Sequence, residues 1–395
     1  RRIGGTANQV DVPQGLAPAR GEQNLPTNLL GAVKLTGGAN GFRYGAMTAI
    51  EDEVSWRATD ALGRDQQIMD AGRDFSVLRL LYEHKDENRL GLGYLGTQVT
   101  GPRYKASVQG LDLHYGLGSG LFGVDMQLVQ SDRAGETGRG GILDVRYAAS
   151  SAIQHKFEFE YFDSKVNVND LGFLRRNNYR GGQYLLSYAY PKPGRWFQAA
   201  RGTLIFRHQE NLTAGQVVDQ GVFWRNTLVL KGRNTIRSAM AYLPSRYEDR
   251  NSRGNGAYKT SDRIWLNALW ATDASRSLSF STSIGGLQED LGDWTLSLTA
   301  GVTARLSDSL YFDLDFAYKR RTGWVVYQGG REFGAFDAID LQPSFDLNWF
   351  LAADHQIKFS FQWAGVKAYE RQAYRVPSAD GALQRRAGAA GPRDF

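Results

Sequence analysis

The feature that most constrains the fold of this chain is an alternation of apolar and polar residues, sustained over segments of about ten residues. Between residues 153 and 162, Phe157, Phe159 and Tyr161 alternate with Glu158 and Glu160. Successive side chains of a β-strand point to opposite faces, so each such segment has an apolar face and a polar face. A helical period of 3.6 residues does not persist beyond two turns in any segment. The alternation therefore predicts an all-β chain.

We expect about eighteen strands in the 395 residues. Their ranges are 29–36, 42–51, 74–85, 89–99, 106–116, 121–131, 140–149, 153–163, 179–190, 196–209, 221–232, 235–247, 260–272, 277–287, 292–305, 310–321, 337–351 and 355–369. A tilted strand crosses a bilayer in about 9–11 residues, whereas the strands of soluble proteins average about five or six. The lengths therefore favour strands that cross a membrane.

The two faces of these strands support the same prediction. Aromatic residues such as Trp294, Tyr318 and Trp349 lie at the ends of the apolar sets, as in the aromatic girdles of outer-membrane barrels. The opposite face carries charges in mid-strand, which are costly in a dry core but are solvated or paired in a polar lumen. We predict an all-β transmembrane antiparallel β-barrel of about 18–20 strands. A soluble β-sandwich or propeller is the alternative.

Composition excludes several other classes of protein. The longest apolar runs fall short of the roughly 18 residues of a membrane-spanning helix, and the mean hydropathy is −0.43. The 42% hydrophobic content argues against a disordered chain, and the absence of cysteine excludes disulfides and thiolate metal sites. The net charge of +6 comes from residues scattered along the chain rather than from a basic stripe, so we expect no nucleic-acid partner.

The connections between the predicted strands differ in length. Short turns alternate with long polar segments at 52–73, 131–139, 164–178, 210–220, 248–259, 322–336 and 370–392, which is typical of periplasmic turns and extracellular loops. We predict an N-terminal linker or plug over residues 1–28 and the barrel over 29–395. The first connection, Gly37–Gly41, is short, and the basic tract 379–393 has no strand pattern. With a periplasmic N-terminus the first connection should be a long extracellular one. Either a strand therefore precedes residue 29, with a position upstream of Arg1 as one option, or the chain departs from the usual polarity, and we favour the missing strand. We also expect closing strands downstream of Phe395.

Three segments resemble one family of bacterial outer-membrane proteins of uncharacterised function. They are Arg1-Arg2-Ile3-Gly4, the strand Leu30–Gly37, and Asn169-Asp170-Leu171-Gly172-Phe173-Leu174-Arg175-Arg176-Asn177. The resemblance covers nearly the whole chain, although its motifs are short. It implies an N-terminal carbohydrate-binding-like module of the family nine type upstream, a large C-terminal barrel, and one more hairpin after residues 393–395. It implies no enzymatic role.

Two patterns that suggest other chemistry have simpler explanations. Gly91-Leu-Gly93-Tyr-Leu-Gly96 matches the dinucleotide-binding fingerprint, but no helix follows it, and glycines are common in barrel strands. The five histidines lack metal-site spacing, and only His208 with Glu210, beside a long connection, suggests an outer-membrane hydrolase. We expect an interfacial or hydrogen-bonded role for the histidines, and neither a metal nor a cofactor.

The candidate site residues are charged side chains of the predicted lumen. On strands they are Lys156, Glu158, Glu160, Asp313 and Asp315, and after a strand they are Arg175, Arg176 and Arg180. We expect Asp313 and Asp315 to pair with basic neighbours, with Lys319, Arg305, Lys358 and Arg263 available, rather than to act in acid–base catalysis. The arginine-rich segment forms either a constriction that selects anionic or hydroxyl-rich solutes, or a structural loop held by arginine–carboxylate pairs.

These observations favour a bacterial outer-membrane channel or receptor that is not an enzyme. Its expected partners are outer-membrane lipid and a polar solute, with carbohydrate as one candidate. A plugged structural or assembly barrel that holds a partner protein at the cell surface is the main alternative. An outer-membrane hydrolase is a further one.

Overall fold

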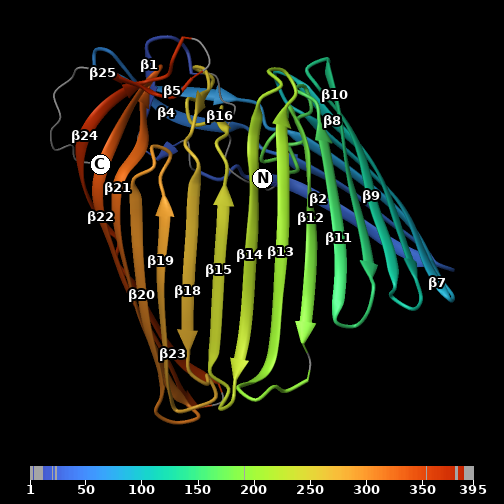
Figure 1. Ribbon diagram of the computed structural model, residues 1–395. Coiled ribbons are helices and arrows are strands. Elements are labelled where there is room, and N and C mark those ends of the chain that lie inside the picture. The colour runs from blue at the N-terminus through green and yellow to red at the C-terminus, as the bar shows by residue number, and fades with distance from the viewer. Residues whose placement is uncertain are drawn as a thin grey trace. The chain divides into compact units, whose positions relative to one another are not determined.

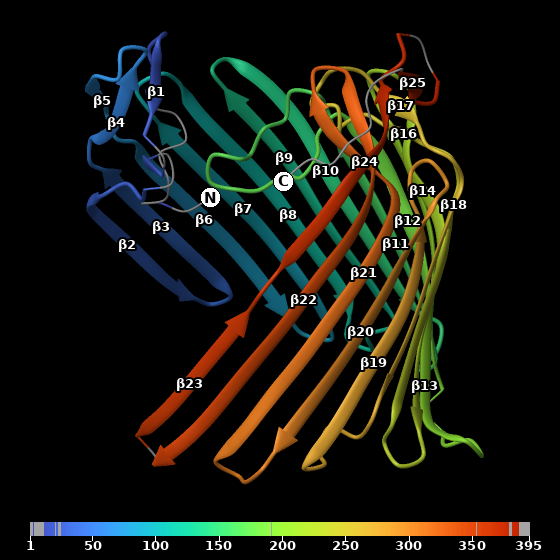
Figure 2. The same cartoon turned by 90° about the vertical axis from the view of Figure 1, so that its left-hand side faces the viewer.

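The structure is a computed structural model that describes residue 3 and residues 12–19, 21–22, 25–190, 192–352, 354–378 and 381–386. The chain divides into two compact units. Unit 1 contains residues 1–148, 156–182 and 211–214, and unit 2 contains residues 149–155, 183–210 and 215–395. Strands make up most of both units, and no α-helix occurs among the described residues (Figures 1 and 2). In that part of the chain, accordingly, no helix is long and apolar enough to cross a membrane.

Unit 1 is an antiparallel sheet in which each long strand pairs with the next one in the sequence. Its strands are β2 (Leu29–Ala39), β3 (Phe42–Glu51), β6 (Asp74–Lys85), β7 (Asn88–Thr100), β8 (Lys105–Leu117), β9 (Phe122–Arg133) and β10 (Glu136–Ala148). A separate three-stranded sheet contains β1 (Leu16–Pro18), β4 (Val54–Asp60) and β5 (Asp65–Asp70). β11 (Ile153–Phe162) and β12 (Tyr179–Tyr190) each contain residues of both units.

Unit 2 has the same next-neighbour order (Figure 1). Its strands are β13 (Phe197–Asn211), β14 (Val217–Leu230), β15 (Thr235–Leu243), β18 (Arg263–Ala271), β19 (Leu278–Gln288), β20 (Trp294–Arg305), β21 (Leu310–Gly329), β22 (Glu332–Ala352), β23 (His355–Gln362), β24 (Gly365–Arg375) and β25 (Gln384–Arg386). β23 and β24 pair with the two halves of β22, as Figure 2 shows. β16 (Tyr247–Glu248) and β17 (Tyr258–Lys259) form a short hairpin in the β15–β18 connection.

Each of the eighteen predicted ranges coincides with a strand, the last one being divided between β23 and β24. Antiparallel pairing of sequence neighbours is the strand order of an up-and-down β-barrel. The predicted fold class, all-β with an antiparallel barrel order, is confirmed. The strand order follows from the sequence because short turns join most neighbours, and a two-residue turn can only return the chain antiparallel.

Several predicted long loops are wrong. β9 and β10 continue through 131–139 to a two-residue turn at Ala134–Gly135, and β21 and β22 continue through most of 322–336. Segment 52–73 contains β4 and β5, and β24 extends into 370–392 as far as Arg375. Apolar alternation does not mark these segments, because polar residues dominate 131–139 and because Trp324–Tyr327 is a continuous apolar run. Their backbone groups nevertheless pair with neighbouring strands. The segment predicted as a linker or plug, 1–28, is described in part and contains β1. In the tract 379–393, expected to form no strand, residues 384–386 form β25, and residues 379–380 and 387–393 lie outside the described residues.

The long strands expose apolar side chains on one face. On β18, Ile264, Leu266 and Trp270 are exposed, whereas Arg263, the first residue of the strand, is buried on the other side. The registers continue this face across β15, β19 and β20, where Met240, Ile284 and Leu298 align with it. We call this the apolar face and the opposite one the polar face.

Small buried clusters lie near the ends of the strands. In unit 2, Tyr258, Phe333 and Val376 form one such cluster with their neighbours, and the Tyr258 hydroxyl lies 3.0 Å from Asp290 Oδ2. Burial, followed by the negative charge of Asp290, raises the pKa of Tyr258, so its phenol remains a neutral donor. The cluster joins the β16–β17 hairpin to the ends of β22 and β24.

Candidate functional site

The polar face of unit 1 carries a ladder of ion pairs between strands that are adjacent or separated by one strand. Arg79 on β6 pairs with Asp112 on β8, and Asp112 also accepts a hydrogen bond of 2.9 Å from Gln127 on β9. Glycine at position 93 leaves room for this pair, because a Cβ there would lie 2.7 Å from the Asp112 carboxylate. The fingerprint Gly91–Gly96 thus lies within strand β7 and contributes space on the polar face. It does not lead into a helix.

The next strands continue the ladder and include three predicted site residues. Lys156 on β11 lies 3.1 Å from Asp144 on β10 and also pairs with Glu158. Glu160 accepts a hydrogen bond of 2.5 Å from the Tyr179 hydroxyl. A charged side chain on a sheet loses part of its hydration. The attraction of an oppositely charged neighbour on the same face offsets that cost. The alternation correctly places these three side chains on one face, but their lumenal role stays a prediction.

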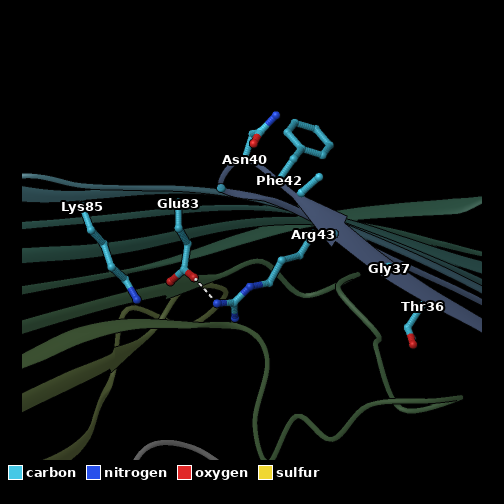
Figure 3. A pocket seen from close by; sticks show the side chains of 10 residues that line it. Thr36, Gly37, Asn40, Phe42, Arg43, Glu83 and Lys85 are labelled. Carbon is cyan, nitrogen blue, oxygen red and sulfur yellow. Dashed lines mark ion pairs between the residues drawn. The ribbon is translucent and has the colours of Figure 1, made fainter.

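At the turn between β2 and β3, the same face bounds a hollow of about 540 Å³. Figure 3 shows Arg43, Glu83 and Lys85 extending to one side of the sheet, while Phe42 points to the other. Glu83 accepts from two guanidinium groups, at 3.3 Å from Arg43 and 3.1 Å from Arg89. Because Glu83 is shared by two arginines and Lys85 stands nearby, this hollow has an excess of positive charge.

The segment 164–178 lies against the polar face of unit 1 and is anchored there by Asp170. Asp170 is 6% exposed and accepts hydrogen bonds from the Tyr104 hydroxyl (2.6 Å) and from Arg133 Nε (3.3 Å). The Arg133 guanidinium also lies 4.1 Å from the centre of the Tyr104 ring. Leu171, next in the chain, packs on the cluster of Ala49, Phe75 and Val99. A buried carboxylate with two donors fixes the segment on this face.

A second anchor holds the first part of the same segment. Val166 is buried with Phe162 and Tyr179, and the amide of Asn167 donates to Ser131 Oγ at 2.9 Å. Gly138 on β10 permits this contact, because a Cβ at that position would lie 2.1 Å from the Val166 nitrogen.

The three predicted arginines are not these anchors. Arg175 and Arg180 are exposed, whereas the Arg176 guanidinium lies 6.0 Å from the centre of the Tyr179 ring. Arg176 and Glu160 therefore meet at the same tyrosine. The anchoring pair is the arginine–carboxylate type predicted for a structural loop, but its arginine, Arg133, comes from the sheet. The sequence pattern did not single out Asp170, Tyr104 or Arg133, because nothing local marks residues 37 or 66 positions apart as partners.

Asp313 and Asp315 lie on the polar face of β21 in unit 2. The Thr303 hydroxyl donates to Asp313 at 2.6 Å, and Gly301 leaves room for the Asp315 carboxylate. The expected basic partners are wrong for the described part of unit 2, where Arg263 pairs with Asp290 at 2.6 Å and Arg305 donates to the Ala274 carbonyl. Hydroxyl groups dominate β19 and β20 on this face, and the Thr303 hydroxyl supplies the hydrogen bond to Asp313. His208 Nε2 lies 3.2 Å from Glu210 Oε1, so that predicted pair does form.

We expect Gly138→Ala to release segment 164–178 from the sheet. The added Cβ would overlap backbone atoms of Lys165 and Val166, which cannot move away as a flexible side chain can. Trypsin should then cleave at Lys165 and Arg175 faster than in the native chain. Gly116→Ala is the matched control, since a Cβ there meets its nearest atom at 3.9 Å. Equal cleavage rates for the two variants would contradict the anchoring role of this contact.

Comparison with known proteins identifies the family. The family model described as "Domain of unknown function (DUF5916)" matches residues 1–394. The chain belongs to this family. The expectation of an uncharacterised family is thereby confirmed, whereas its carbohydrate-binding-like module stays an expectation from the sequence.

The comparisons with solved structures and with curated proteins do not identify a function. Among solved structures, the chain is similar to the "Anion-selective porin from Comamonas acidovorans", with 12% identity, a TM-score of 0.36, and coverage of 86% of this chain and 100% of that one. A TM-score of 0.36 is too low to establish a shared fold. No curated protein matches the chain.

Proposed function

We propose that this chain spans a bacterial outer membrane as a β-barrel whose polar face lines a conduit for polar solutes. The observation that carries the proposal is the exposed apolar face of consecutive strands, on which large side chains such as Ile284, Leu296 and Phe359 stand outside any core. Soluble proteins rarely expose an apolar surface that extends over many strands, because water makes it unfavourable. Lipid removes that cost.

Strand length supports the same proposal. β6 and β20 have 12 residues each, and β7 and β8 have 13. Such strands cross a hydrocarbon layer when tilted, and the paired backbone groups of the sheet interior satisfy the requirement that lipid imposes on them. Aromatic side chains at strand ends, among them Trp294 and Trp349, would meet the two interfaces.

The charges of the polar face support a conduit. Ion pairs such as Arg79–Asp112 and Lys156–Asp144 retain partly exposed side chains, so water reaches them. A water-filled lumen of a barrel with about 18 strands is wide enough to pass small solutes. Polar solutes, with carbohydrate as one candidate, are the proposed cargo of this conduit.

Reconstitution of the purified chain into planar bilayers tests the conduit. We expect stepwise currents in potassium chloride. A bilayer that carries no current at any voltage, with insertion verified by protease protection, would overturn the open conduit.

One alternative has a specific observation in its favour. Segment 164–178 packs on the polar face, and Ile3 joins the same cluster as Leu171, so parts of the chain occupy space that an open conduit would leave to water. If such segments filled the whole lumen, the chain would be a plugged structural barrel that holds a partner protein. Absence of current in the bilayer experiment would support it.

Arg175 and Arg176 provide a test of the predicted constriction. If the segment narrows the conduit, replacing both by alanine should shift the reversal potential in a salt gradient toward cation selectivity, because two fixed positive charges are lost. Arg64→Ala, which removes an exposed charge in the turn between β4 and β5, is the control. Unchanged selectivity in the double variant would overturn the constriction.

A further inference from the structure

Three arginines gather on the polar face of unit 2 around one threonine. Thr227 on β14 lies directly opposite Arg201 on β13 and directly opposite Arg237 on β15. Arg225 precedes Thr227 by two residues, so it projects from β14 on the same face. We call Arg201, Arg225 and Arg237 the arginine triad.

Strand geometry places these side chains within reach of one another. Neighbouring strands lie about 4.8 Å apart, which sets the Cα atoms of Arg201 and Arg237 about 10 Å apart on either side of Thr227. Arg225 lies about 7 Å from Thr227 along its strand. Arginine side chains are long enough to converge on one small group above the threonine.

The triad lacks the acidic partners that other arginines of the polar face have, among them Arg207 and Arg79. Arg207, farther along β13, lies 3.3 Å from Asp219, and in unit 1 Arg79 pairs with Asp112. Within the part of the chain that the structure describes, none of the triad guanidinium groups lies within ion-pair distance of a carboxylate, and all three side chains are exposed. Like charges on adjacent strands repel one another. A bound anion would relieve that repulsion.

The surroundings of the triad provide further hydrogen-bond donors. Arg201 and Arg225 line a hollow of about 290 Å³ together with the hydroxyl-bearing residues Ser187, Thr203 and Thr227. Hydroxyl groups complement guanidinium forks, which bind the oxygens of carboxylate, sulfate or phosphate in pairs.

We propose that the arginine triad is a binding site for oxyanions, in which Arg201 and Arg237 hold the anion from two sides, Arg225 from a third, and the Thr227 hydroxyl donates from below. In the conduit proposed above, the site would select anionic solutes such as carboxylates and phosphate esters. That role rests on the proposed conduit, whereas the binding itself does not.

Calorimetric titration of the full chain in detergent with inorganic phosphate tests the binding. The variant R201A/R225A/R237A should lose at least a hundredfold in affinity, since each charge-assisted contact contributes about tenfold. R201K/R225K/R237K keeps the charge without the planar fork and should bind with intermediate affinity. K192A/K231A/R276A removes the same charge from exposed turns and should bind like the native chain. Absence of phosphate binding by the native chain, or equal binding by the first variant, would overturn the site.

Bilayer currents separate this inference from the proposed function. We expect phosphate to reduce the chloride current of the native chain and to leave that of R201A/R225A/R237A unchanged. If the native chain and R201A/R225A/R237A both carry current and phosphate reduces the two currents equally, the site is overturned and the conduit is supported. Absence of current together with phosphate binding that requires the triad would overturn the conduit and leave the site standing.

Discussion

Glu51→Ala is expected to lower the free energy of unfolding by about 3–5 kcal/mol, the cost of removing one partner from a buried ion pair. Glu51 at the end of β3 is 4% exposed, and Arg73 before β6 is 8% exposed. Their side chains meet in two hydrogen bonds, Arg73 Nε to Oε2 at 2.8 Å and Nη2 to Oε1 at 3.1 Å. Alanine would leave the Arg73 guanidinium buried without this carboxylate. Urea unfolding in detergent, followed by tryptophan fluorescence, measures the loss.

Two further variants make this prediction specific. Glu51→Ala combined with Arg73→Ala should be more stable than Glu51→Ala alone, because it removes the uncompensated charge as well. Arg64→Ala breaks an ion pair whose arginine side chain is 70% exposed, and it should leave the unfolding midpoint nearly unchanged. A double variant that is less stable than Glu51→Ala would show that packing, rather than charge, explains the effect.

Phe336→Ala is expected to cost about 3–5 kcal/mol, because it removes a large buried side chain and leaves a cavity. Phe336 on β22 is 0% exposed and packs with Ala338 and Ala368, beside Trp324 and Val326. The same unfolding measurement checks the value.

The matched control for this cavity is Phe173→Ala. Phe173 lies in segment 164–178 and is 82% exposed, so its loss should change stability by less than about 0.5 kcal/mol. Equal destabilisation by the two substitutions would contradict the buried packing of Phe336 in unit 2.

The strand positions were predictable because their signal is local. Alternation within a dozen residues shows which side chains lie on each face of a strand, whichever strand it pairs with. Short turns make neighbouring strands antiparallel. Lys156, Glu158 and Asp313 were therefore placed on the polar face from the sequence alone. The same signal failed at the outer parts of β21 and β22, where Gly323 and the continuous apolar run Trp324–Tyr327 interrupt the alternation, and it underestimated the length of that hairpin.

The partners of the polar residues were not predictable in the same way. We expected Asp313 and Asp315 to meet basic side chains, but a hydroxyl of the adjacent strand contacts Asp313, and Arg263 is taken by Asp290. Which residue stands opposite another depends on register, and a shift of one residue moves every side chain to the other face. Register is determined by turns and bulges that alternation does not encode.

The sequence by itself determined that this chain is all-β, where its eighteen predicted strands lie, and that these strands have an apolar and a polar face, because these properties follow from the order of neighbouring residues. The tertiary structure alone decided that Asp170 anchors segment 164–178 to Arg133 and Tyr104, and that Thr227 stands between Arg201 and Arg237. These contacts join residues distant in the chain, and only the pairing of whole strands brings them together.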